Sequence, residues 1–329
     1  IPDIARHIIR NTGYPKEVFD ADACTIMTSF VDHTATDYLS YDLDNMDDAA
    51  IDKIPVRQQA SVFGYACDQT PALMPLPIWL AHRLADRLDS PKVADKLPWL
   101  LPDGETQAGI EYLGGKPGRI HSITLVATQT TPDAVDLEQL REDIRREVVD
   151  PVLKKEKLKP DAETRIFINP GGARTGGGPA VHSGLTGRKT GIDTYGGYAR
   201  HSGAALSGKD PMRIDRVGAY IARYAAKNVV AAGIARECEV QLSYTVGVAR
   251  PVSLRVRTFG TAEMGDTAIA ARLEQVIDFR LGGIVRDLNL KRLGEVSKGG
   301  YHDLAVYGHM GRTDPDMPWE MTDTADALN

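Results

Sequence analysis

Apolar residues recur at helical spacing along much of the chain. Ile4, Ile8 and Ile9 predict a short helix that ends before Gly13. Longer stripes of the same spacing predict helices at residues 80–88, 136–149, 216–232 and 268–279. Pro77 precedes the first of these longer stripes and suits a first helical turn.

Runs of apolar or alternating residues between these helices predict strands. They lie at residues 24–31, 122–128, 165–169, 240–248 and 253–258. Strands and helices follow one another so that helices can cover apolar sheet faces. This order predicts an α+β fold.

A polar, acidic segment interrupts the pattern at residues 32–52, which contain DYLSYDLDNMDD. A loop of that length in a compact protein is typical of a lid over a binding site. A disordered surface excursion has the same composition. The sequence leaves both interpretations open.

Composition narrows the class of protein. The chain has 329 residues, of which 42% are hydrophobic and 26% charged, as in globular proteins with two or three core-bearing units. Its net charge of −6 argues against nucleic acid as the main partner. No apolar run reaches membrane-spanning length. The three cysteines have no metal-binding spacing and favour a reducing compartment, the cytoplasm. The opening Ile-Pro-Asp has no signal-peptide features and indicates the interior of a longer protein.

One stretch, residues 168–216, combines many glycines with many cations. Glycines let backbone amides approach an anion, and several cations together suit a polyphosphate. Asp193, Asp210 and Asp215 stand among them and predict a divalent metal beside the phosphates. The cations are Arg174, Arg188, Lys189, Arg200, Lys209, Arg213 and Arg216.

Motifs within this stretch resemble one family. GLTGRK (184–189), DTYGG (193–197) and SGKDP (207–211) are similar to signatures of the S-adenosylmethionine synthetases, also called methionine adenosyltransferases. The resemblance covers essentially the whole chain. Further matches in family order include FGYAC (63–67), INP (168–170), AKNVVAAGIA (226–235), YGH (307–309) and PWE (318–320).

The resemblance implies a fold of three intertwined α+β domains about a pseudo-threefold axis, with active sites at a dimer interface. It assigns residues 69–173 to an N-terminal-type domain. Residues 1–41 with 174–213 form the central domain, and residues 42–68 with 214–329 the C-terminal domain. A homo-oligomer, or a hetero-oligomer with a paralogue, is expected.

The resemblance also implies a reaction. ATP and L-methionine form S-adenosylmethionine, and the displaced tripolyphosphate is hydrolysed to phosphate and diphosphate. A thioether needs no deprotonation, so alignment and charge neutralisation carry the chemistry. Mg²⁺ and K⁺ are the implied cofactors.

Several residues match the family's functional positions. Lys209, Arg188 and Lys189 match triphosphate-binding cations and are the expected catalytic residues. Asp215 matches a magnesium ligand, although an aspartate at the start of a predicted helix is also an ordinary N-cap. The other expected ATP- or phosphate-binding positions are Asp103, Ala205 and Arg213, the last standing where the family has lysine.

Other positions depart from the family pattern. Gln58 replaces an aspartate, and Glu105 replaces a lysine expected to face phosphate. Ala173 and Arg174 displace an arginine and an aromatic residue, and His182 replaces a carboxylate expected to bind the methionine amine. The family's opening segment, with His-Pro-Asp-Lys and potassium- and methionine-binding glutamates, has no counterpart.

Most matched phosphate contacts are therefore kept, while most matched methionine contacts are lost. Three hypotheses follow: an active methionine adenosyltransferase; an ATP-using member with another nucleophile, or with tripolyphosphatase activity only; and a non-catalytic subunit that pairs with an active paralogue.

Overall fold

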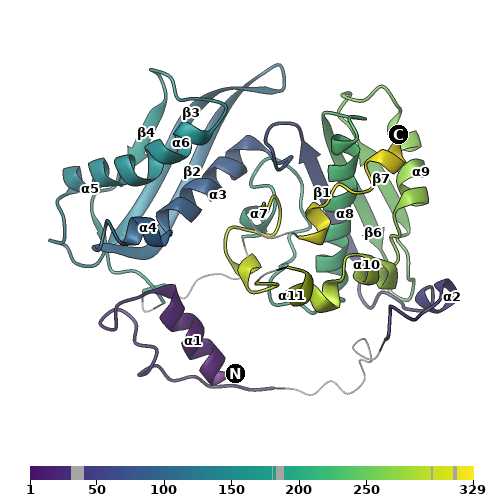
Figure 1. Cartoon of the computed structure of the whole chain (residues 1–329), viewed down its shortest axis with the longest axis horizontal. Coiled ribbons are helices and arrows are strands. Elements are labelled where there is room, and N and C mark those ends of the chain that lie inside the picture. The colour runs from purple at the N-terminus through teal and green to yellow at the C-terminus, as the bar shows by residue number, and fades with distance from the viewer. Residues whose placement is uncertain (31–40, 180, 183–188, 298, 314–316) are drawn as a thin grey trace. The chain divides into compact units, whose positions relative to one another are not determined.

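The computed structural model describes residues 1–30, 41–179, 181–182, 189–297, 299–313 and 317–329. The chain divides into two compact units (Figure 1). The first contains Ile1–Ala35 and Leu80–Leu185, and the second contains Thr36–Trp79 and Thr186–Asn329. The boundary falls within helix α3 (Leu76–Leu88). Each unit has its own sheet and its own core.

The first unit is built on a mixed sheet. Strands β2 (Leu100–Leu113) and β3 (Lys116–Gln129) form an antiparallel hairpin. Gly114 and Gly115 make its two-residue turn with φ of 57° and 77°, values that favour glycine. Strands β4 (Arg165–Ile168) and β5 (Arg174–Thr175) both pair with β3 in parallel.

Helices bury the apolar face of this sheet. Along α3, Leu80, Leu84 and Leu88 enter the core that contains Ile123 and Leu125 of β3. Helix α5 (Leu137–Ile144) continues through a π-helical turn, Arg145–Val149, into α6 (Asp150–Lys155). The unit also has the short helix α4 (Pro91–Ala94) and helix α1 (Pro2–Thr12), which ends at Gly13 with φ 88°.

The second unit is an antiparallel sheet covered by a long helix. The strand order is β1 (Ala60–Cys67), β6 (Glu237–Tyr244), β7 (Ser253–Arg257). Helix α8 (Ile214–Ala231) packs against β1 and β6. At Gly64 the approach is so close that an added Cβ would lie 1.9 Å from the carbonyl carbon of Ala222. The glycine of FGYAC is therefore required by helix–sheet packing.

Shorter elements surround this sheet and helix. The α-helices are α2 (Asp48–Ile51), α7 (Thr190–Asp193), α9 (Asp266–Val276), α10 (Leu281–Asp287) and α11 (Leu293–Val296). Single 3-10 turns lie at Leu290–Arg292, Asp303–Ala305, Pro318–Glu320 and Asp326–Leu328.

The predicted α+β class is confirmed, and each of the five predicted helices overlaps a helix of the structure. The strand predicted at residues 24–31 is wrong: residues 24–30 form no strand, and Val31 lies outside the described residues. Met27 is 90% exposed and Phe30 71% exposed, so the apolar run has nothing to pack against. The strand predicted at residues 240–248 begins earlier and ends at Tyr244. The pattern missed β1, β2 and α10.

The polar segment at residues 32–52 is anchored over its second half. Leu43 and Ile51 are buried, and residues 48–51 form α2. A fully disordered excursion is therefore wrong for residues 41–52. Residues 32–40 of the predicted lid lie outside the described residues.

No helix in the described parts of the chain is long and apolar enough to cross a membrane. The two compact units do not correspond to the expected three domains, but they do not exclude them. The three-domain division stays a prediction.

Candidate functional site

The first turn of α8 carries a carboxylate surrounded by nitrogen donors. The ammonium of Lys209 donates to Oδ2 of Asp215 at 2.6 Å, and the Gln58 side-chain amide donates to the same oxygen. Nε of Arg213 lies 3.9 Å from Oδ2. The side chains of Lys209 and Asp215 are 22% and 14% exposed, so the pair is partly shielded yet accessible.

Asp215 does not cap the helix. Arg213 occupies the N-cap position, its side chain makes no capping hydrogen bond, and Asp215 lies within the first turn. The N-cap alternative is therefore wrong. The carboxylate is available for a cation, either Lys209 or a bound metal.

The departure at Gln58 has a local explanation. An aspartate here would place a second carboxylate against Asp215, and two like charges in contact repel unless a cation lies between them. A neutral amide instead donates to Asp215. Gln58 therefore adds a neutral donor to Asp215, where an aspartate would add a second negative charge.

The three aspartates of the glycine-rich stretch do not gather around one point. The Asp210 carboxylate accepts a hydrogen bond from the backbone N–H of Met212 at 2.7 Å. Asp193 is partly buried, and this burial raises its pKa. Within the described ranges, no three His, Cys, Asp or Glu side chains lie close enough together to hold a metal ion. Mg²⁺ often uses one or two carboxylates and completes its shell with water and substrate phosphate. Asp215 fits that mode, and a three-aspartate site does not.

Two of the seven cations serve structure. Arg200 makes two hydrogen bonds from Nε, at 3.0 and 3.1 Å, to the buried carboxylate of Glu239. Arg216 is buried, donates to the carbonyl of Leu206 at 2.8 Å and lies 4.5 Å over the ring of Tyr301. Burial closes Arg216 to a phosphate, whereas the Arg200 side chain is 46% exposed and is held by its ion pair with Glu239.

The remaining sequence-predicted cations are exposed or outside the described residues. Lys189 is exposed and precedes α7, and Arg213 is exposed at the start of α8. Ala205 is half-buried in the loop that leads to Lys209. Arg188 lies outside the described residues, and its role stays a prediction.

The first unit carries Asp103 on β2. Its Oδ1 accepts from the hydroxyl of Tyr14 at 2.9 Å, and its buried Oδ2 has no partner among the described residues. A Cβ at Gly177 would lie 2.0 Å from that Oδ2, so a larger residue there would force the Asp103 side chain to move. Burial and the hydrogen bond to Asp103 raise the pKa of Tyr14, which keeps it a donor. This buried Asp103 oxygen is therefore an unused hydrogen-bond acceptor.

Two departures from the family pattern contact each other. Nη1 of Arg174 lies 2.7 Å from Oε1 of Glu105. The negative charge that replaces the family's lysine is thereby paired with a positive charge that replaces its aromatic residue. Ala173 and His182 are exposed.

We expect this pair to contribute little to stability. The two side chains are 69% and 48% exposed, and exposed ion pairs contribute about 0–1 kcal/mol. Glu105→Gln, Arg174→Gln and the double variant should each change the free energy of unfolding by less than about 1 kcal/mol in urea titrations. A loss above roughly 2 kcal/mol in either single variant would show that the pair is part of the core.

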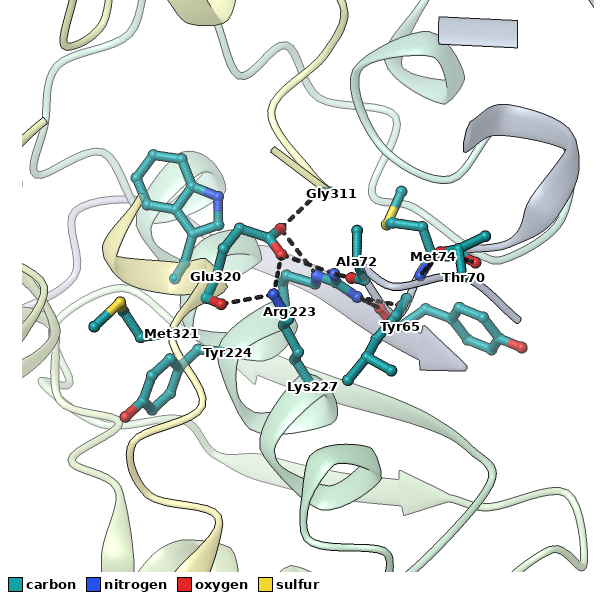
Figure 2. Close-up of polar contacts among 12 residues, drawn as sticks. Tyr65, Thr70, Ala72, Met74, Arg223, Tyr224, Lys227, Gly311, Glu320 and Met321 are labelled. Atoms are coloured by element: carbon teal, nitrogen blue, oxygen red, sulfur yellow. Dashed lines mark hydrogen bonds and ion pairs between the residues drawn. The ribbon is translucent and has the colours of Figure 1, made fainter. Parts of the chain in front are cut away.

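A buried ion-pair network was not predicted from the sequence. Figure 2 shows Arg223 of α8 between Glu320 and carbonyls of β1 and of the segment that follows it. Arg223 donates to both oxygens of Glu320, at 3.1 and 2.8 Å, and to the carbonyls of Tyr65, Ala72 and Leu73, at 2.7, 2.7 and 2.9 Å. These bonds use all five N–H donors of the guanidinium.

Glu320 is the centre of this network. Lys227 donates to its carboxylate at 2.8 Å and to its carbonyl at 2.6 Å, and the Gly311 amide donates at 2.7 Å. Burial alone would raise the pKa of Glu320, but the charges of Arg223 and Lys227 lower it. The network ties the PWE segment to α8, whose first turn carries Asp215.

A second buried residue, His309, reaches the loop of SGKDP. Its Nε2 lies 2.9 Å from Oγ of Ser207, and its Nδ1 lies 2.7 Å from the hydroxyl of Tyr220. Its backbone N–H donates to the carbonyl of Asp193 at 2.8 Å. One residue of YGH therefore contacts both the DTYGG and SGKDP motifs.

Comparisons with known proteins agree with these motifs. Residues 53–174 match the family model described as S-adenosylmethionine synthetase, central domain, and residues 176–321 match that of the C-terminal domain. A protein of Trichodesmium erythraeum (strain IMS101), named S-adenosylmethionine synthase, is 41% identical over 341 aligned positions. The alignment covers 99% of this chain and 81% of that protein.

Proposed function

The chain belongs to the S-adenosylmethionine synthetase family, and we propose that it forms S-adenosylmethionine from ATP and L-methionine, releasing phosphate and diphosphate. The observation that carries the proposal is the partly shielded Lys209–Asp215 pair at the first turn of α8. It supplies a cation for triphosphate and a carboxylate for the metal that the family uses.

Charge neutralisation is the main task of these residues. Lys209 presents an ammonium already held by Asp215, and a bound triphosphate oxygen can share it without reorganisation. Arg213 and Lys189 are exposed and can approach the same polyanion. Mg²⁺, held by Asp215 together with the phosphates, would neutralise further negative charge.

The methionine half of the reaction needs binding rather than acid–base chemistry. The sulfur attacks the 5′ carbon with its own lone pair, the carbon–oxygen bond to the triphosphate breaks, and no proton moves. The buried Asp103 oxygen, which has no hydrogen-bond partner among the described residues, supports a role in binding a ligand hydroxyl or ammonium. Replacement of the family carboxylate by His182 argues that the methionine amine is bound differently here.

The wider setting is proposed on the family alone. The chain would act in the cytoplasm as a homo-oligomer, or beside an active paralogue, with K⁺ as a second cation. Three intertwined domains would form the assembled subunit.

ATP turnover with and without methionine tests the proposal. The pure protein with Mg²⁺ and K⁺ should form S-adenosylmethionine only when methionine is present. Phosphate release without methionine would favour a tripolyphosphatase or another nucleophile. Turnover only after mixing with an ordinary family member would favour a non-catalytic subunit.

A further inference from the structure

Ser207 lies at the solvent-facing end of a short hydrogen-bonded chain that begins in the core. The chain runs from the Tyr220 hydroxyl on α8 through the ring of His309 to Oγ of Ser207, over 2.7 and 2.9 Å. His309 and Tyr220 are fully buried, whereas Ser207 is half-buried. Ser207 stands two residues before Lys209 in the same loop, across Gly208 with φ 74°.

The protons of this chain can be assigned from its chemistry. Burial, with the charges of Arg216 and Arg312, lowers the pKa of His309 to about 3, so the ring is neutral near pH 7. A neutral imidazole has one N–H and one lone pair. Burial raises the pKa of Tyr220, so its hydroxyl keeps its proton.

The direction of the hydrogen bonds follows. Within the described residues the Tyr220 hydroxyl has one hydrogen-bond partner, Nδ1 of His309, and a buried phenol donates when it can. Nδ1 therefore holds the lone pair, and Nε2–H donates to Oγ of Ser207. The Ser207 hydrogen then has no acceptor among the described residues, and its hydroxyl is left as a donor.

We propose that Ser207 donates a hydrogen bond to an oxygen of the bound triphosphate, with His309 and Tyr220 as positioning residues that set its direction. The inference rests on the proposed function, since it names a further contact of the same site. The neighbouring Lys209 supplies charge, and Ser207 supplies a directed neutral donor. The backbone bond from His309 to Asp193 holds the ring between the two motifs.

Calorimetric binding of tripolyphosphate with Mg²⁺ to the full chain tests this contact. Ser207→Ala should weaken binding by about 10-fold, since a hydrogen bond to a charged oxygen is lost. His309→Asn, which loses the Nε2 donor, should weaken it similarly, and the double variant should weaken it no further. His309→Gln should restore most of the affinity, because its amide nitrogen can replace Nε2–H. Ser253→Ala, at an exposed strand position, is the matched control.

Unchanged binding in Ser207→Ala, or additive losses in the double variant, would overturn the proposal. A second measurement needs no variant: imidazole ¹⁵N shifts should show His309 as the Nε2–H tautomer from pH 5 to pH 9. The opposite tautomer would also overturn it.

Failure of the two proposals gives different results. Ser207-dependent tripolyphosphate binding without S-adenosylmethionine formation would contradict the proposed function alone. S-adenosylmethionine formation with triphosphate binding independent of Ser207 would contradict the further inference alone.

Discussion

Replacing Glu320 by alanine is expected to lower the free energy of unfolding by about 3–5 kcal/mol. The substitution leaves Arg223 and Lys227 buried without their shared counter-ion, and removing one member of a buried ion pair exposes the desolvation cost of the rest. Urea unfolding followed by circular dichroism measures the change.

Glu295 provides the matched control. Its side chain is 73% exposed and lies 3.9 Å from Arg292, so Glu295→Ala should change the free energy by less than about 0.5 kcal/mol. A small loss for Glu320→Ala, similar to that of the control, would mean that the network is not a stabilising part of the second unit.

The same network predicts a pH dependence. The pKa of folded Glu320 lies below the ordinary value of 4.5, so its contribution is complete above pH 4.5 and is lost as pH falls through the lowered value. The stability difference between wild type and Glu320→Gln should therefore be constant at neutral pH and shrink below about pH 4.5. A difference that grows on acidification would contradict the charge assignment.

Lys209→Met is expected to reduce kcat/KM for ATP by at least about 100-fold. A preorganised cation at a position where negative charge develops contributes about 3–4 kcal/mol to catalysis, and methionine keeps the apolar stem without the charge. Loss of the ammonium also leaves Asp215 with Gln58 as its main donor. Steady-state kinetics at saturating L-methionine measure the effect.

The exposed Lys53 is the control for the loss of one positive charge. Lys53→Met should leave kcat/KM within about 2-fold of wild type, because a solvent-exposed, screened charge contributes little. A Lys209→Met variant with near-normal kinetics would remove Lys209 from the site. A parallel fall in melting temperature would instead indicate damage to the fold.

Local sequence patterns predicted the features that depend on residues close together in the chain, such as helices and short motifs. The apolar stripe and Gly233 marked helix α8. The SGKDP motif singled out Lys209, the family match singled out Asp215, and the two contact each other. The strand predicted at residues 24–31 is wrong because a strand is stable only when it pairs with another strand. An apolar run does not show which segment of the chain it would pair with.

Contacts between segments far apart in the chain could not be predicted from the sequence. Arg223 and Glu320 are 97 positions apart, and Ser207 and His309 are 102 positions apart. The motifs that contain Lys227, His309 and Glu320 were visible as family matches, but their mutual bonds were not. Glu105 and Arg174 were separate departures in the sequence, and only their contact shows that they compensate each other.

The most direct test of the central claim is the product balance of a single reaction. With ATP, L-methionine, Mg²⁺ and K⁺, the chain should yield S-adenosylmethionine, phosphate and diphosphate in equal amounts. Phosphate and diphosphate without S-adenosylmethionine would contradict the claim that this chain is a methionine adenosyltransferase.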